Sequence, residues 1–192
     1  MHWFTIVLVP ADIQDVKAAV DALLEPYDQY REVESYKFYI EGENLQRFAE
    51  HYNIPVTDLA ALAKNVLAWT GQGEGRVDER GLYFMSSANP QGMWDYWRIG
   101  GNWNGVIQGK RRAMTVPGKN GLEHEPLQYN ICPVVELAPD IFAWHLITPD
   151  GHWHEGGWGR AGDEDREQWR ATLWELLEQH RNCIAVGVDC SF

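Results

Sequence analysis

The sequence predicts an α+β fold, an elaborated ferredoxin-like sandwich whose sheet is mostly antiparallel and whose helices lie on one face. Three observations lead to this prediction. The chain opens with a strand-like run followed by a helical stripe, and it closes with a helical stripe followed by a strand-like run. Between these ends, two turns with Pro second and Gly fourth indicate hairpins. Because 192 residues can form one substantial core, we expect a single domain over residues 1–192.

The two ends of the chain supply the frame of the predicted sheet. Residues 2–9, HWFTIVLV, are almost continuously apolar and β-branched, which is typical of a strand covered on both faces. Asp12 is a suitable N-cap for a following amphipathic helix that ends near Pro26. An apolar stripe indicates a second helix over residues 163–181, and residues 183–190, CIAVGVDC, alternate as a strand does. We expect the first and last strands to be neighbours in one sheet.

The middle of the chain combines helices, a connector and turns. Residues 43–69 predict a helical insertion in two pieces, broken at Pro55 and with Asp58 as the N-cap of the second piece. Residues 70–81 are a Gly-rich polar connector. The turns NPQG at 89–92 and TPDG at 148–151 are each predicted to join the strands on either side of them.

Charge and cysteine content exclude several classes of protein. A net charge of −12 argues against direct nucleic-acid binding, which depends on Lys and Arg at phosphates. No run approaches the ~20 apolar residues that span a bilayer, and the start of the chain has no basic leader, so we expect a cytoplasmic protein without membrane contact. Cys183 and Cys190 would lie ~23 Å apart on one strand, so we expect them and Cys132 to be free thiols.

The densest aromatic stretch is residues 93–105, MWDYWRIGGNWNG. As a strand, it places Trp94, Tyr96 and Arg98 on one face and Trp97 on the other. If one face is core, the other exposes rings and a guanidinium group that could stack on a planar ligand. The alternative is that both faces are buried and that Arg98 only pairs with an acidic residue.

The same stretch opens the one net-positive part of the sequence. Residues 91–122 carry five basic side chains and one acidic side chain. The glycines permit a bulge or a close approach of the backbone to a neighbour or ligand. We therefore expect an anionic ligand here, and the candidate ligand-binding residues are Trp94, Tyr96, Arg98, Gly100, Gly101, Asn102, Trp103, Lys110, Arg111 and Arg112.

The histidines suggest weaker sites. In a hairpin around the TPDG turn, His145 faces Glu155, while His152 and His154 project from the other side. His145 and Glu155 could act as an acid and base in a hydrolase, although a cross-strand polar pair is the simpler interpretation. His152 and His154 are the candidate metal ligands, but a zinc site needs a further donor, so we expect no metal.

The segments DLAALAKNVLAWTG, NPQGMWDYWRIGGNWNG and TPDGHWHEGGWG resemble successive landmarks of a family of uncharacterised bacteriophage and bacterial proteins. The segment LLEPYDQYREVESY is similar to the usual start of that family. The resemblance implies a phage or prophage setting in a bacterial host and no settled activity. Where the family tends to have a basic residue after the Gly pair, this chain has Asn102, which puts a shared anion-binding role of that position in doubt.

From these observations we expect non-enzymatic binding of a small planar anionic ligand, such as a nucleotide or a nucleotide-derived signal. Sequestration of a host signal by a phage would be a natural use. The alternative is an acidic interaction module, or an inhibitor of a host nucleic-acid enzyme, with a host protein as partner. The hydrolase that uses His145 and Glu155 is third. No cofactor is expected, and the sequence does not indicate an oligomeric state.

Overall fold

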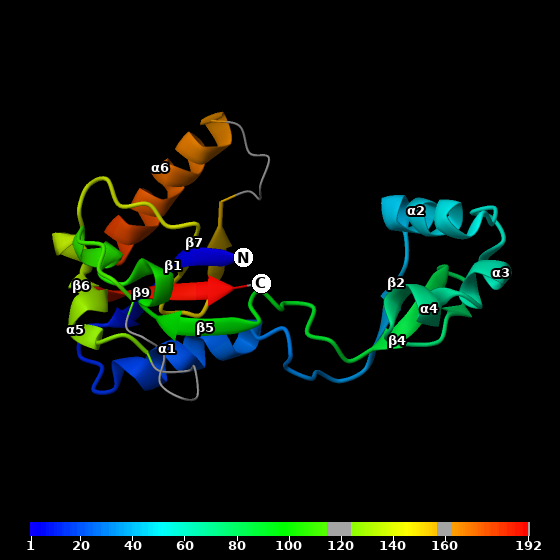
Figure 1. The fold of residues 1–192 in the computed structure, drawn as a ribbon, viewed down its shortest axis with the longest axis horizontal. Coiled ribbons are helices and arrows are strands. Elements are labelled where there is room, and N and C mark those ends of the chain that lie inside the picture. Colours follow the sequence, from blue (N-terminus) through cyan, green and yellow to red (C-terminus); the bar gives the residue numbers. More distant parts are fainter. Residues whose placement is uncertain (115–123, 157–162, 192) are drawn as a thin grey trace. The chain divides into compact units, whose positions relative to one another are not determined.

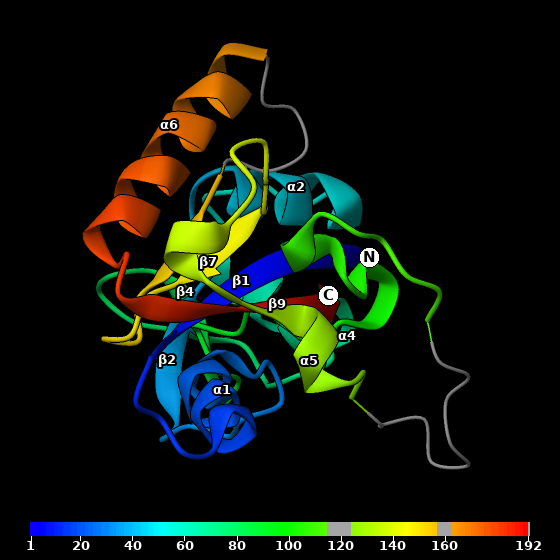
Figure 2. The same ribbon diagram turned by 90° about the vertical axis from the view of Figure 1, so that its left-hand side faces the viewer.

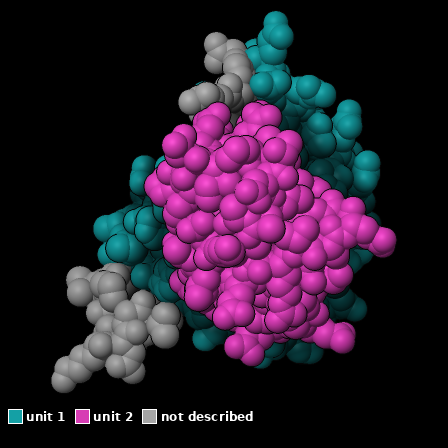
Figure 3. Space-filling model, turned by 90° about the vertical axis from the view of Figure 1, so that its right-hand side faces the viewer, with its two compact units in different colours: residues 1–29, 91–192 teal, residues 30–90 magenta. Residues whose placement is uncertain are grey.

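The computed structural model describes residues 1–114, 124–156 and 163–191, and Figure 1 shows its elements. The chain forms two compact units, coloured separately in Figure 3. Unit 1 comprises residues 1–29 and 91–192, and unit 2 comprises residues 30–90. The chain that the sequence treats as one domain is thus divided, and unit 2 extends on both sides of the predicted helical insertion at 43–69.

Unit 1 is built on a sheet whose centre is β1 (His2–Pro10). β1 pairs antiparallel with β9 (Cys183–Ser191) and parallel with β7 (His145–Ile147). The strand order is β5-β9-β1-β7-β8, with β5 at Tyr96–Ile99 and β8 at Trp153–Glu155; β6 (Ile131–Pro133) also pairs with β9. The predicted pairing of the first and last strands is confirmed, and the fold is mixed α/β with a mostly antiparallel sheet.

The two long helices of unit 1 cover opposite faces of this sheet. Figure 1 and Figure 2 both show α6 (Asp163–Gln179) on one side of β1 and β9 and α1 (Val16–Leu24) on the other. Leu24 of α1 packs with Val7, whereas Leu173 of α6 packs with Ile6. The prediction of helices on one face is therefore wrong.

The strand order explains why the helices separate. β1, α1 and β5 form one crossover between parallel strands, and β8, α6 and β9 form another. Both crossovers run in the same direction across the sheet, but the strands of the first are antiparallel to those of the second. A right-handed connection must then place the two helices on opposite faces.

Two local predictions in unit 1 need correction. The N-cap of α1 is Asp15 and not Asp12, since the Asp15 side chain accepts a hydrogen bond of 3.0 Å from the Ala18 N–H. The NPQG turn does not join two strands of one sheet, because β4 (Leu82–Ser86) lies in unit 2 and β5 pairs with β9. The TPDG hairpin is confirmed, with His145 opposite Glu155 and with Gly151 at a φ of 84°.

Short helices complete unit 1, and two of its three thiols, Cys132 and Cys190, are buried, while Cys183 is half-buried. These helices are η1 (Glu25–Tyr27), η2 (Gly101–Trp103), η3 (Val106–Gln108), α5 (Leu127–Asn130) and η4 (Val134–Glu136). Cys132, Cys183 and Cys190 are free, as predicted, and burial raises the pKa of Cys190 to about 12.

Among the described residues, none of the helices combines the length and the apolar character needed to cross a membrane.

Unit 2 packs three helices on a small sheet of order β2-β4-β3. Its strands are β2 (Tyr36–Tyr39), β3 (Arg76–Val77) and β4 (Leu82–Ser86), and its helices are α2 (Gly42–Tyr52), α3 (Leu59–Ala63) and α4 (Val66–Thr70). Asp58 caps α3 as predicted. The predicted connector at 70–81 contributes β3, and a Cβ at Gly75 would overlap the Ala63 carbonyl oxygen. This segment is therefore packed and not merely a link.

Candidate functional site

The tryptophan-rich stretch predicted as a ligand site begins with structural contacts. The Trp94 side chain is buried, and its indole Nε1 donates a hydrogen bond of 2.9 Å to the Leu24 carbonyl at the end of α1. Tyr96, at the start of β5, is half-buried and lies opposite Ser191. Trp94 therefore fastens α1 to this edge of the sheet, and its ring is not available to a ligand.

Arg98 is buried and paired with an acidic residue. Its guanidinium Nη2 donates a hydrogen bond of 2.7 Å to Oε1 of Glu125, and the side chains are 5% and 0% exposed. The Glu125 N–H also donates to the Ile99 carbonyl, which brings the returning chain alongside β5. The prediction that Arg98 presents an exposed guanidinium group is therefore wrong. The structure shows the alternative, in which Arg98 pairs with an acidic residue.

The glycine pair allows the backbone to approach a buried carboxylate. Gly100 and Gly101 have φ values of 76° and 51°, which favour glycine. A Cβ at Gly101 would overlap the Asp189 side chain, and the Asn102 N–H donates a hydrogen bond of 2.9 Å to Oδ2 of Asp189. The predicted close approach occurs, but its partner is a strand residue of the same chain.

Two buried asparagines hold the turn that follows. Nδ2 of Asn130 donates to Oδ1 of Asn104 at 3.0 Å, and the Gly105 N–H donates to Oδ1 of Asn130 at 2.9 Å. Nδ2 of Asn104 donates to Oε2 of Glu125 at 3.3 Å. Through Glu125, these two asparagines are linked to Arg98, and all four side chains are buried.

The exposed remainder of the predicted site is cationic. Lys110, Arg111 and Arg112 are exposed, as their charges require. The Arg111 guanidinium lies 5.6 Å from the centre of the Trp103 ring, and that of Arg112 lies 4.1 Å from the centre of the Tyr129 ring. We call these five residues the arginine–ring surface. Of the ten predicted ligand-binding residues, the structure thus leaves only Lys110, Arg111 and Arg112 exposed; the others are buried or half-buried.

His145 is placed for packing and not for contact with a substrate. It is 3% exposed, lies between Trp3 and Trp153, and has Nδ1 3.3 Å from Oγ1 of Thr5. Burial lowers the pKa of His145 to about 4, so the ring is neutral at pH 7. Glu155 lies opposite it, as predicted, and is exposed.

The other two histidines belong to the TPDG turn. Nδ1 of His152 lies 2.9 Å from Oδ2 of Asp150, and Nε2 of His154 lies 3.3 Å from Oγ1 of Thr148. Over residues 1–114, 124–156 and 163–191, no three His, Cys, Asp or Glu side chains gather where they could hold a metal ion. The two histidines therefore stabilise the turn in this structure.

The site that the sequence analysis missed is a cavity of about 520 Å³ in unit 2. One face of the small sheet forms its floor, because Tyr36 and Phe38 alternate along β2 and Phe38 lies opposite Phe84. Ile40, directly after β2, continues this face. Trp69, from the last turn of α4, forms a second wall. We call this cavity the aromatic pocket, and its lining residues are Tyr36, Phe38, Ile40, Asn44, Trp69, Thr70, Gln72, Phe84, Ser86, Ala88, Asn89 and Pro90.

The aromatic pocket offers rings and amides but no charge. Phe38 and Trp69 are 44% and 42% exposed and line the same cavity, so together they form an exposed apolar surface. None of the twelve lining residues is charged, and polar groups come from amides and hydroxyls such as Asn44, Gln72 and Ser86. This combination of apolar rings and a few polar groups is typical of small-ligand pockets.

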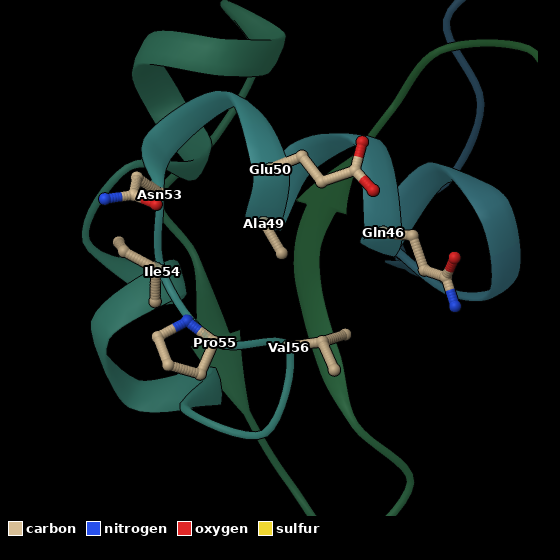
Figure 4. A pocket seen from close by; sticks show the side chains of 7 residues that line it. All are labelled: Gln46, Ala49, Glu50, Asn53, Ile54, Pro55 and Val56. Carbon is tan, nitrogen blue, oxygen red and sulfur yellow. The ribbon is translucent and has the colours of Figure 1, made fainter.

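A second cavity of unit 2 has a different character. It measures about 420 Å³ and lies where α2 ends, as Figure 4 shows. Its lining includes Ala49, Glu50, Asn53 and Ile54 but no aromatic ring. This second cavity offers no stacking surface and carries a carboxylate. The aromatic pocket is therefore the stronger candidate site.

A sequence signal for the aromatic pocket exists, although it is weak. In YKFYI at 36–40 and in LYFMS at 82–86, every second residue lines the pocket, apart from Leu82 in the core. Such alternation predicts strands with one face set apart. It does not show that the face remains open, because Trp69 and Gln72 join the face only after the helices have packed.

Comparison with protein-family models, with curated proteins and with solved structures finds no match to this chain.

Proposed function

We propose that this chain is a non-enzymatic binding protein that holds a planar ligand group in the aromatic pocket of unit 2. The observation that carries the proposal is the pair of half-exposed rings, Phe38 and Trp69, in an uncharged cavity. A planar group that stacked on either ring would remove apolar surface from water. Stacking of a base on an aromatic side chain contributes about 1–3 kcal/mol.

Both rings are held in place by neighbours within unit 2. The centre of the Phe38 ring lies 5.2 Å from that of the buried Phe84 ring, across the β2–β4 pair. The centre of the Trp69 ring lies 5.4 Å from that of Phe48 and 5.0 Å from that of His51, both on α2. Rings that are already ordered lose little conformational entropy when a ligand binds, which favours affinity.

The uncharged lining defines the part of the ligand that enters. A phosphate or carboxylate group would find no cation in the pocket. A neutral aromatic ring needs no cation and can stack on Phe38 or Trp69. We therefore propose that the bound group is neutral. For a nucleotide or a nucleotide-derived signal, the base would occupy the pocket and the phosphate would remain outside it.

Native mass spectrometry of the purified protein, followed by calorimetric titration with adenosine, uridine and inosine, tests this function. We expect either a co-purified ligand mass or binding of one nucleoside, with Trp69→Ala lowering the affinity roughly tenfold or more. Leu67→Ala is the matched control, because Leu67 is exposed on the same helix but does not line the pocket. Absence of both ligand mass and nucleoside binding would contradict the proposal.

The arginine–ring surface supports a second proposal, in which an anionic group binds to unit 1. Two guanidinium groups over rings, next to the exposed Lys110, can donate paired hydrogen bonds to a phosphate. Replacement of Arg111 and Arg112 by Ala should then weaken binding of adenosine diphosphate and leave binding of adenosine unchanged. Equal affinity of both proteins for adenosine diphosphate would remove this candidate.

Further proposals rest on the sequence alone. These are the phage setting, sequestration of a host signal, and a host protein as partner of an acidic surface. The ferredoxin-like frame is a proposal for the strand–helix and helix–strand ends of unit 1, whose helices nevertheless lie on opposite faces of the sheet.

A further inference from the structure

Most polar groups of the aromatic pocket are already engaged within unit 2. The Tyr36 hydroxyl donates a hydrogen bond of 3.1 Å to the Ala88 carbonyl. The Thr70 hydroxyl donates to the Val66 carbonyl at 3.0 Å and accepts from the Gln72 N–H at 3.2 Å. These hydroxyls shape the pocket, and their protons are not offered to a ligand.

A short relay orients the Gln72 side chain. The Ala88 N–H donates to Oγ of Ser86 at 3.2 Å, and the Ser86 hydroxyl donates to Oε1 of Gln72 at 3.3 Å. Because Oε1 accepts from Ser86, the amide presents Nε2 with two N–H donors. Among the hydrogen bonds of the described residues, none uses this Nε2 atom.

A second carboxamide lines the pocket from α2. Asn44 is exposed in the first turn of α2, and its side chain makes no hydrogen bond to any other described residue. Its amide offers both an acceptor and two donors. The two free amides therefore set different requirements, since Gln72 calls for an acceptor and Asn44 can serve either kind of group.

We infer that the aromatic pocket selects a planar lactam heterocycle, a ring that carries a carbonyl next to a ring N–H, as in uracil or hypoxanthine. The ring stacks on Phe38 or Trp69, a carbonyl oxygen accepts from Nε2 of Gln72, and the remaining lactam edge pairs with the Asn44 amide. This selectivity rests on the proposed function, since it names the ligand class of the same pocket. An apolar ring would displace water from the exposed amides of Gln72 and Asn44 without replacing its hydrogen bonds, whereas a lactam would replace them.

Calorimetric titration with four probes tests the selectivity. Uridine and inosine carry the lactam, 5,6-dihydrouridine keeps the carbonyls but loses the planar ring, and a phenyl C-riboside keeps the planar ring but has no polar ring atom. We expect uridine or inosine to bind roughly tenfold or more tightly than the other two probes.

Two variants examine the hydrogen bonds directly. Gln72→Glu replaces the donors by acceptors and should lower the affinity for the lactam probe roughly tenfold. Ser86→Ala removes the group that orients the amide and should lower the affinity several-fold. Gln46→Glu is the matched control, because it makes the same exchange at an exposed position of α2 that does not line the aromatic pocket.

The outcomes separate this inference from the proposed function. Binding of the phenyl C-riboside as tight as that of uridine and inosine, with no effect of Gln72→Glu, would overturn the lactam selectivity and leave a planar-ring pocket. Equal binding of uridine and dihydrouridine would contradict stacking, and with it the proposed function. If none of the four probes binds, both are overturned. Melting temperatures of the variants confirm that each remains folded.

Discussion

Arg98 and Glu125 form a buried ion pair in which Nη2 lies 2.7 Å from Oε1, and Nδ2 of Asn104 reaches the second carboxylate oxygen at 3.3 Å. Removing one partner leaves a buried charge without compensation. We expect Arg98→Ala to lower the free energy of unfolding by about 3–5 kcal/mol, measured by denaturant titration. Arg111→Ala, at an exposed position, should change it by less than about 1 kcal/mol. Equal effects of the two variants would contradict the assignment.

The same pair can be tested by double replacement. Arg98→Met combined with Glu125→Leu removes both charges and retains apolar volume, so it should recover much of the stability that Arg98→Ala loses. A double variant as unstable as the single one would show that the pair also holds the loop through geometry that an apolar contact cannot replace.

Because His145 is buried, we expect the stability of the fold to fall at mildly acid pH. The pKa of His145 in the folded chain is about 4, below the ordinary value of 6.5, because burial disfavours the charged ring. Its contribution is therefore fully present above pH 6.5 and is lost as the pH falls towards 4, by up to about 3 kcal/mol. His145→Gln should flatten the dependence of the unfolding free energy on pH in this window. A dependence that stays as steep in His145→Gln as in the unchanged chain would contradict the assignment.

At Gly101, we expect even the small side chain of alanine to lower the free energy of unfolding substantially. At a φ of 51°, a Cβ would overlap the Asp189 side chain, so Gly101→Ala combines backbone strain with a steric clash. We expect a loss of more than about 2 kcal/mol in the free energy of unfolding. Gly109, at a φ of 70° with no atom within 4 Å of a Cβ, is the matched control. Gly109→Ala should cost only the strain, about 1 kcal/mol.

Tyr27 links η1 to the TPDG hairpin through two hydrogen bonds. Its hydroxyl donates to the Gly151 carbonyl at 2.5 Å and accepts from the Trp153 N–H at 3.0 Å. Tyr27→Phe should lower the melting temperature through two lost hydrogen bonds, about 1–3 kcal/mol together. Tyr83→Phe should have a smaller effect, because its hydroxyl makes no hydrogen bond to another described residue. Similar shifts for the two variants would argue against the link.

The sequence predicted those elements whose signal lies within the element itself. The opening strand, the closing helix and strand, and the TPDG hairpin follow from apolar period and turn chemistry, and the structure contains each of them. The NPQG turn carries the same signature but separates two units, because a turn signal does not say which sheet the following strand joins.

The candidate site was harder to predict than the fold. The segment MWDYWRIGGNWNG predicts a close approach of the backbone at its glycines, and the structure contains one, but the partner is Asp189 and not a ligand. The open aromatic face formed by Phe38 and Trp69 gave only a weak signal, since Trp69 lies 31 positions further along the chain. Burial of one ring and exposure of another are not local properties.

The local conformations of this protein follow from short segments of its sequence, because helical period, strand alternation, capping and glycine preference act over a few residues. Which faces became core depends on contacts between segments that lie far apart in the chain. Arg98 pairs with Glu125, 27 positions further along the chain, and α1 and α6 cover opposite faces of the sheet because the crossovers that contain them connect strands of opposite direction. Such pairings depend on the order of strands in the sheet and on the burial of apolar surface by the whole unit, which no single segment of the chain specifies.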